Sequence, residues 1–112
     1  MKQYCLALDL KDDPRMIAEY EAHHRNMSPE ILDSIRDSGV KRMEIFRAGN
    51  RMFMIMEVVD GFSFEQKQRM DESNPSVQEW EALMWKYQQA LPFAKSGEKW
   101  VLMEKIFDTK ID

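Results

Sequence analysis

The sequence predicts an α+β fold in which one antiparallel sheet carries its helices on a single face. Three observations lead to this prediction. Short apolar runs typical of strands alternate with helical patterns along the 112 residues. Proline or glycine marks most of the boundaries between them. The resulting order is a strand, two helices, two strands joined by a tight turn, two more helices and a last strand.

The first strand is predicted over residues 3–10. The triplet Asp12-Asp13-Pro14 then starts a helix, with an aspartate as N-cap and proline at the first helical position. One side of this helix has the spacing of a stripe that faces a core, and it consists of Met16, Ile17, Tyr20 and His24. A second helix is predicted from Ser28-Pro29-Glu30, and Ser38-Gly39 ends it.

Two strands and a turn follow. The strands are predicted over residues 40–47 and 51–59, and the turn is Ala48-Gly49-Asn50. The second strand is apolar on both faces, so it must be covered from both sides.

The last third of the chain predicts a short helix over residues 62–70, a longer helix over 76–90 and a final strand over 99–107. The charged run at 65–69 is interpreted as a solvated helix face. The longer helix carries Trp80 and Trp85, which differ by about 140° around its axis. Aromatic residues at helical spacing usually belong to a core, but these two cannot face the same layer, so one of them could line a pocket.

The order β-α-β-β-α-β is that of a ferredoxin-like sandwich, which we expect residues 1–112 to form as one domain. Helices on one face leave the other face of the sheet open. A second copy of the chain is the simplest cover for its apolar residues. We therefore expect a homodimer in which two sheets pack together, as in a dimeric α/β-barrel.

Composition narrows the classes of function. The chain is 44% hydrophobic and 32% charged with a net charge of −4, which argues against a nucleic-acid partner. No apolar run approaches the roughly 20 residues of a membrane helix. A single cysteine, Cys5, cannot form an internal disulfide, which suits the cytoplasm. Cys5 is interpreted as a small buried hydrophobe and not as a nucleophile.

Both histidines lie near the end of the first helix, and they are the best candidates for chemistry. Tyr20 and His24 are one helical turn apart, so their side chains meet and can form an acid–base or substrate-binding pair. His23 points about 100° away, so the two histidines are not expected to do the same job. A structural histidine bonded to a backbone carbonyl is the competing interpretation. Metal binding is disfavoured because adjacent histidines diverge, and we expect no cofactor. A proton-transfer isomerisation of a neutral ligand and simple ligand binding both fit.

These residues resemble the L-rhamnose mutarotase family over nearly the whole chain. The resemblance is carried by Glu19-Tyr20, His24 and Pro29-Glu30, then by Gly39, Met84-Trp85-Lys86-Tyr87 and Pro92. Residues 49–57 and 77–85 are similar to the branch associated with L-fucose breakdown. The resemblance implies dimers of ferredoxin-like subunits, a monosaccharide as ligand, and no metal or cofactor.

The resemblance also implies roles for single residues. His24 matches the proton donor, and Tyr20 matches a tyrosine that binds the sugar and assists proton transfer. His23 has no such match, so the resemblance implies that it faces solvent. Met84 and Trp85 match a tandem-tryptophan sugar contact of which only Trp85 is retained, and Met43 replaces a sugar-binding tyrosine. Ser28 stands where a tryptophan is usual. The departures at Ser28, Met43 and Met84 are where sugar specificity is expected to differ.

The function expected from the resemblance is interconversion of the α and β anomers of a 6-deoxy-hexopyranose such as L-rhamnose or L-fucose. His24 would act as the acid that protonates the ring oxygen, and Tyr20 would position or relay the second proton. The sugar would stack on Trp85. Two alternatives stay open: a cofactor-free monooxygenase or lactone isomerase of the same dimeric fold, and a sugar-binding module without catalysis.

Overall fold

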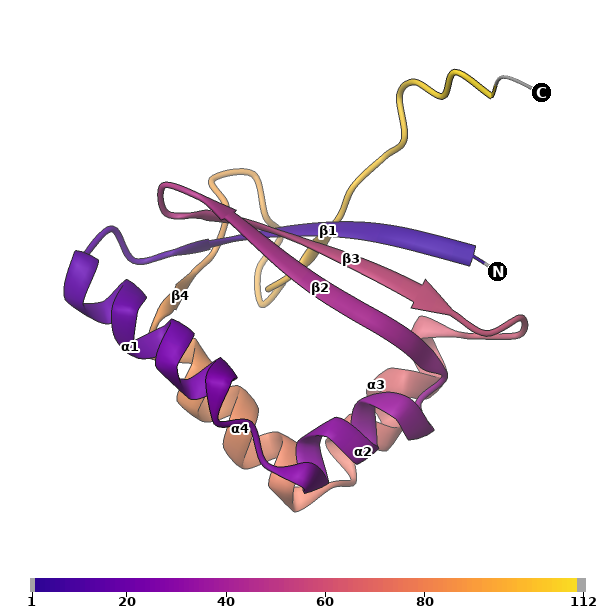
Figure 1. The fold of residues 1–112 in the computed structure, drawn as a ribbon, viewed down its shortest axis with the longest axis horizontal. Helices are drawn as coiled ribbons and strands as arrows, with labels where there is room; N and C mark the ends of the chain where they lie inside the picture. The colour runs from indigo at the N-terminus through magenta and orange to yellow at the C-terminus, as the bar shows by residue number, and fades with distance from the viewer. Residues whose placement is uncertain (1, 111–112) are drawn as a thin grey trace.

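The computed structural model describes residues 2–110 as an antiparallel sheet with a layer of helices on one face (Figure 1). The helices and strands, in chain order, are β1 (Lys2–Leu10), α1 (Pro14–Arg25), α2 (Pro29–Asp37), β2 (Val40–Ala48), β3 (Arg51–Val58), α3 (Phe64–Glu72), α4 (Pro75–Trp85), β4 (Gln88–Gln89) and β5 (Val101–Leu102). The predicted order of elements is confirmed.

The strand order of the sheet is β2-β3-β1-β4, and β5 pairs with β1 beside β4. All of these pairings are antiparallel. This is the ferredoxin-like topology, with β4 and β5 acting as two pieces of its last strand. The sheet of one chain is open at β2, so a barrel is not closed within the single chain.

Local sequence explains where the helices begin and end. The Asp13 carboxylate accepts hydrogen bonds from the backbone N–H groups of Arg15 and Met16 at 2.9 and 3.3 Å, which caps α1. Asn74 caps α4 in the same way. Gly39 follows α2 with a φ of +99°, and a Cβ there would lie 3.1 Å from Val59. Both the backbone angle and the close approach therefore require glycine.

The predicted helix over 76–90 is too long, because α4 ends at Trp85. After α4 the chain joins the sheet. The Tyr87 carbonyl accepts a hydrogen bond from the Lys11 N–H at 2.8 Å, and Gln88 and Gln89 pair with β1. The start of α3 also differs from the prediction, since the Ser63 hydroxyl caps it and the helix begins at Phe64.

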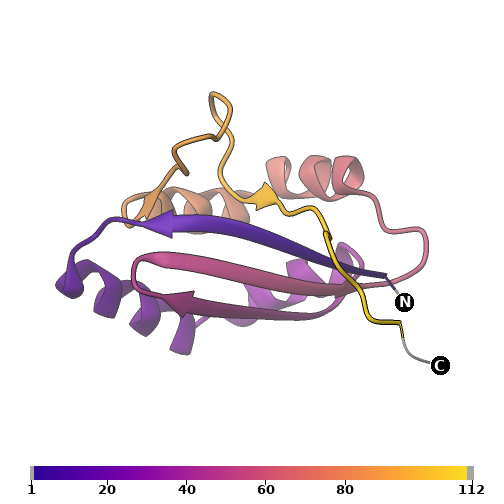
Figure 2. The ribbon, with the colours of Figure 1, turned by 90° about the horizontal axis from the view of Figure 1, so that it is seen from above.

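The predicted strand over 99–107 is much shorter in the structure, where only Val101 and Leu102 pair with β1. One further bond, from the Met103 N–H to the Cys5 carbonyl at 2.8 Å, follows before the chain leaves the sheet (Figure 2). Ile106 and Phe107 are 92% and 78% exposed. No buried position among residues 2–110 receives their side chains, so no contact within that range holds the segment in the sheet.

Pairing register decides which side chains face the helices. Leu6 lies opposite Met54 on β3, and Met54 lies opposite Ile45 on β2. Because directly paired residues share a face, these three side chains point toward the helices. The core on this face forms two clusters, whose buried members are Leu6, Val40, Met54, Met56 and Val58, and Leu8, Leu10, Tyr20, Met52 and Met84.

The opposite face of the sheet has no helix over it (Figure 1). Phe46 and Phe53 are directly paired there, and Phe46 is 53% exposed. Ile55 and Cys5 are also paired on this face and only half-buried. The second apolar side of β3 is thus the face that the helices do not cover.

Candidate active site

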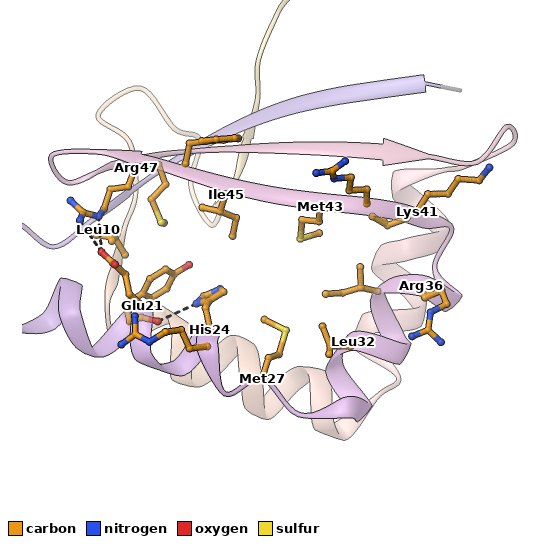
Figure 3. Close-up of a pocket in the computed structure, with 17 residues that line it drawn as sticks. Leu10, Glu21, His24, Met27, Leu32, Arg36, Lys41, Met43, Ile45 and Arg47 are labelled. Atoms are coloured by element: carbon orange, nitrogen blue, oxygen red, sulfur yellow. Dashed lines mark hydrogen bonds and ion pairs between the residues drawn. The ribbon is translucent and has the colours of Figure 1, made fainter.

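A large cavity lies between β2 and the two helices α1 and α2 (Figure 3). Its volume is about 1070 Å³. His24, Met43 and Ile45 line its interior, and the charged Glu21, Arg36, Lys41 and Arg47 lie toward its edges. Arg25 and Arg42 also belong to its lining. The cavity is therefore apolar inside, with a mostly basic rim.

A smaller cavity of about 280 Å³ continues inward between the helices and the sheet. Trp80, Met84 and Gln88 line it from α4 and β4. The two cavities have six lining residues in common: Tyr20, His24, Met27, Ile35, Met43 and Ile45. His24 and Tyr20 therefore lie where the outer cavity meets the inner one, and we call the two the outer cavity and the inner cavity.

The imidazole of His24 is held by its own helix. Nδ1 lies 3.1 Å from the backbone carbonyl oxygen of Tyr20. A carbonyl only accepts, so Nδ1 carries the hydrogen, and Nε2 of the neutral ring is the free acceptor. The ring also packs edge-on to Trp80, with centroids 5.3 Å apart.

Burial lowers the pKa of His24 below its ordinary value of 6.5. The bond to the Tyr20 carbonyl opposes this change, and the charge of His23 adds to it. The imidazole is consequently neutral at pH 7. A neutral ring whose Nε2 faces a cavity is suited to accept a proton.

Tyr20 is 4% exposed, and its ring centroid lies 4.6 Å from that of His24. Its hydroxyl oxygen accepts a hydrogen bond of 3.1 Å from Nε2 of the buried Gln88. Burial raises the pKa of the tyrosine, although the Gln88 bond lowers it in part. The phenol stays protonated, and its own hydrogen is available to another acceptor.

Gln88 was not predicted as a site residue, because the helix predicted over 76–90 included it in its last turn. The only signal was its polarity next to a predicted boundary at Leu91-Pro92. In the structure Gln88 belongs to β4, and strand pairing directs its amide to Tyr20.

His23 does not face solvent as predicted. Its side chain is half-buried, and Nε2 lies 3.3 Å from the hydroxyl of Tyr87. It lines neither the outer nor the inner cavity. The two histidines therefore differ in surroundings, with only His24 at the cavities.

The remaining predicted site residues divide into two groups. Met43 lines both cavities, and Met84 is buried in the wall of the inner cavity. Trp85 lies outside the lining of both cavities, with the ammonium of Lys99 5.1 Å from its ring centroid. Trp80 is the tryptophan of α4 that lines the inner cavity. Ser28 is the N-cap of α2, and its hydroxyl makes no capping bond to the described residues.

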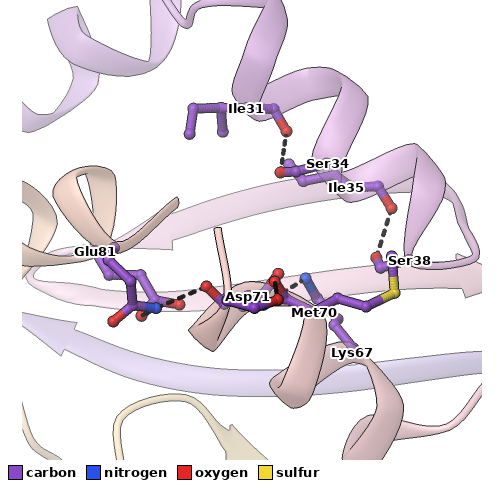
Figure 4. Close-up of polar contacts among 10 residues, drawn as sticks. Ile31, Ser34, Ile35, Ser38, Lys67, Met70, Asp71 and Glu81 are labelled. Carbon is purple, nitrogen blue, oxygen red and sulfur yellow. Dashed lines mark hydrogen bonds and ion pairs between the residues drawn. The ribbon is translucent and has the colours of Figure 1, made fainter. Parts of the chain in front are cut away.

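The charged run at 65–69 is not wholly a solvated face. Lys67 is half-buried and forms an ion pair with Asp71, with Nζ and Oδ2 3.0 Å apart. Both residues line the inner cavity. Figure 4 shows Lys67 and Asp71 on α3 with Glu81 of α4 nearby. Helical spacing alone did not reveal this, because the packing of α3 against α4 decides which side of α3 is covered.

Neither a metal site nor a membrane-spanning helix is present among residues 2–110. No three His, Cys, Asp or Glu side chains converge there in a way that could hold a metal ion. No helix in the same range has the length and apolarity needed to cross a membrane. The fold and the site together define a small ferredoxin-like protein with a histidine–tyrosine pair at a mainly apolar cavity.

Comparison with known proteins gives the family. The profile of the L-rhamnose mutarotase family matches residues 3–109. An L-fucose mutarotase of Xanthomonas campestris is 42% identical over 109 residues, which cover 96% of this chain and 87% of the relative. The chain belongs to the L-rhamnose mutarotase family, whose members are isomerases that interconvert sugar anomers. The family resemblance read from the sequence is confirmed.

Solved structures agree on the fold. An L-rhamnose mutarotase from Formosa agariphila superimposes with a TM-score of 0.71 at 19% identity, covering 98% of this chain and 100% of the other. A dimeric ferredoxin-like protein from an uncultured marine organism gives a TM-score of 0.55 at 12% identity, covering 83% and 95%. Both likenesses support the ferredoxin-like topology.

Proposed function

We propose that this protein is a mutarotase for 6-deoxy-hexopyranoses and that L-fucose is a better substrate than L-rhamnose. The main support for this activity is that a neutral His24 and a protonated Tyr20 lie together where the two cavities meet. The choice of sugar is supported by the 42% identity to an L-fucose mutarotase.

Ring opening needs one proton removed and one supplied. In the proposed mechanism Nε2 of His24 takes the proton of the anomeric hydroxyl while the Tyr20 hydroxyl donates its proton to the ring oxygen. The bond between the anomeric carbon and the ring oxygen breaks, which gives the open-chain aldehyde. Rotation about the C1–C2 bond presents the other face of the carbonyl. The reverse transfers then close the ring as the other anomer.

This assignment exchanges the roles that the resemblance implied for the first step. An acid role for His24 needs the imidazolium form, which burial disfavours. Tyr20 is the group that holds a proton at neutral pH. Over the full reaction both residues donate and accept once, because ring closure is the reverse of ring opening. Each positioned transfer contributes about 10²–10⁴-fold to the rate.

We further propose that the apolar side of the sugar ring packs on Trp80 in the inner cavity. This residue is held edge-on against His24, close to the reacting atoms. Met43 and Met84 line the same cavity and would shape its apolar wall. Trp85, the sugar contact that the resemblance implied, lies outside the lining of both cavities, so Trp80 takes its place in this proposal.

We also propose that the protein is a cytoplasmic homodimer whose open sheet faces pack together. The paired Phe46 and Phe53 give this face an exposed apolar patch, which favours burial against a second copy. The single cysteine suits a reducing compartment. A protein of similar fold, with a TM-score of 0.55, is described as a dimeric ferredoxin-like protein.

The decisive experiment is anomeric-exchange NMR on a panel of 6-deoxy sugars, with saturation transfer to detect binding in the same samples. Faster exchange of L-fucose anomers than in buffer is the expected result. Binding without faster exchange would identify a sugar-binding module instead. Neither binding nor exchange would favour a monooxygenase or lactone isomerase of the same fold.

A further inference from the structure

We propose that Lys67 and Asp71 form a sugar-recognition subsite that binds two neighbouring ring hydroxyls on the side away from the anomeric carbon. This inference rests on the proposed sugar mutarotase function and names a further specificity determinant for it. The pair lines the inner cavity together with His24 and Tyr20. It lies on α3, an element to which the predicted chemistry assigned no role.

The ion pair is unusual in this protein because of its burial. The side chains of Lys67 and Asp71 are 19% and 16% exposed. Two other local ion pairs, each three residues apart, are far more exposed: the side chains of Arg36 and Asp33 are 71% and 58% exposed, and those of Lys105 and Asp108 are 74% and 49% exposed. Half-burying two charges costs solvation free energy that one ion pair only partly offsets. Further polar partners inside the cavity would complete that compensation.

The position of the pair matches the far end of a sugar held by Tyr20. The backbone carbonyl of Asp71 accepts a hydrogen bond of 2.9 Å from Gln78 on the second turn of α4. Tyr20 packs in the same buried cluster as Met84, on the last turn of α4. Gln78 and Met84 are six residues apart on α4, which corresponds to a rise of about 9 Å along the helix axis. We place one pyranose ring across this span, with a hydrogen bond at each end.

The chemistry of the pair suits a diol. Among the described residues, the Lys67 ammonium has one recorded partner, Asp71, so two of its three N–H donors are available. The Asp71 carboxylate keeps acceptor capacity on Oδ1. A hydroxyl both donates and accepts, so two adjacent hydroxyls match this donor–acceptor pair. The neighbouring carboxylate of Glu81, which also lines the inner cavity, disfavours an anionic ligand there.

A purely structural role for the Asp71 side chain is the competing explanation. The contact that ties α3 to α4 uses the Asp71 backbone carbonyl, which a side-chain substitution leaves in place. Asp71→Asn therefore changes the charge and the acceptor capacity at the cavity while it retains this tie.

A matched control lies one position further along the same helix. Glu72 accepts a hydrogen bond of 3.0 Å from Gln68 with the same four-residue spacing, but on the exposed side of α3 and outside the inner cavity. Glu72→Gln is the same type of change as Asp71→Asn without access to the ligand. Lys67→Met tests the donor half of the pair.

The experiment measures dissociation constants by NMR titration and exchange rates at saturation, for L-fucose and for its 3-deoxy and 4-deoxy analogues. For Asp71→Asn we expect L-fucose to bind about 10–100-fold more weakly, as for loss of a hydrogen bond to a charged group, with the saturated rate changed by less than about threefold. An analogue that lacks the bound hydroxyl should bind Asp71→Asn and wild type nearly equally. Lys67→Met should show the same pattern, and Glu72→Gln should match the wild type.

Two results would overturn the subsite. One is equal weakening of L-fucose and both deoxy analogues by Asp71→Asn, which indicates a structural role. The other is a wild-type affinity for L-fucose in Asp71→Asn. In either case an intact wild-type exchange activity leaves the mutarotase function standing. If the wild type neither binds nor exchanges any sugar in the panel, the proposed function fails first and the subsite falls with it.

Discussion

Nδ1 of His24 lies 3.1 Å from the backbone carbonyl oxygen of Tyr20, so the two site residues are joined through the backbone and not through the phenol. The phenol is engaged by Gln88 instead. This arrangement fixes the tautomer of the imidazole and leaves one polar atom of each side chain for a ligand. The pair therefore offers one proton acceptor and one proton donor at the same cavity wall.

Removing the imidazole should abolish most of the catalysis. We expect His24→Ala to reduce the rate of anomer exchange by about 10²–10⁴-fold, as for the loss of one positioned general base. The fold should persist, which a thermal melt checks. His23→Ala is the matched control, because His23 lies next in sequence but lines neither cavity, and it should retain most of the activity. Full activity in His24→Ala would contradict the assignment.

The pH dependence should report the titration of His24. The rate of exchange is expected to fall at acid pH as the imidazole is protonated, with a midpoint below 6.5 because burial lowers its pKa. His23→Gln removes a nearby positive charge that contributes to this lowering, so the midpoint should move toward higher pH. Exchange rates of both proteins between pH 4.5 and about 8 test this, and a midpoint above 6.5 in the wild type would contradict it.

Stability should change with pH for the same reason. The pKa of His24 is lower in the folded than in the unfolded protein, so the unfolded state binds more protons below pH 6.5. The stabilisation from the neutral imidazole is thus fully present above pH 6.5 and is lost as the pH falls through the folded pKa. Urea unfolding of wild type and His24→Gln over this range should show a smaller acid-side decrease in the variant. Equal slopes in the two proteins would argue against a lowered pKa.

The Tyr20 hydroxyl should contribute both to activity and to stability. Tyr20→Phe leaves the buried Gln88 amide without its acceptor, which costs about 1–3 kcal/mol of unfolding free energy. It also removes the proton donor, so exchange should slow by about 10²-fold or more. Gln88→Leu breaks the same hydrogen bond but keeps the hydroxyl. It should retain much more activity than Tyr20→Phe, and equal losses in the two variants would show that the hydroxyl acts only through folding.

The open face of the sheet should be the dimer interface. Phe46→Glu and Phe53→Glu place a charge in the directly paired aromatic patch and should convert the dimer to a monomer at micromolar concentration. Light scattering after size exclusion measures this. Leu32→Glu changes an equally exposed apolar residue on α2, in the helical layer, and should leave the dimer intact. A wild-type monomer would refute the interface directly.

Most of the fold was predictable from local signals. The helix starts at Pro14 and Pro75 depend on the capping side chains of Asp13 and Asn74, and all three helices, including the one that begins at Pro29, have proline at the first helical position. The turn at Gly49 and the end of α2 at Gly39 depend on backbone angles that glycine adopts most easily. These features involve neighbours in sequence, so periodicity and punctuation reveal them.

The errors occurred where distant partners compete for the same residues. Gln88 and Gln89 continue a helical pattern, yet pairing with β1 draws them into the sheet. The strand-like segment after Leu102 has the pattern of a strand but lacks a partner within residues 2–110 beyond Met103. Both outcomes depend on which distant segment pairs with these residues in the sheet, and the neighbouring residues in the sequence do not contain that information.

For the site, helical spacing alone predicts that Tyr20 and His24 share one helix face, because a turn of α-helix brings residues four apart together. Local spacing does not reveal that burial keeps His24 neutral, that Gln88 binds the phenol, or that Lys67 and Asp71 reach the same inner cavity, since these depend on the packed fold. Desolvation, strand pairing and helix packing are produced by contacts between segments far apart in the chain. Spacing along one helix therefore brings the two candidate residues together, and contacts between distant segments set their protonation states and their surroundings.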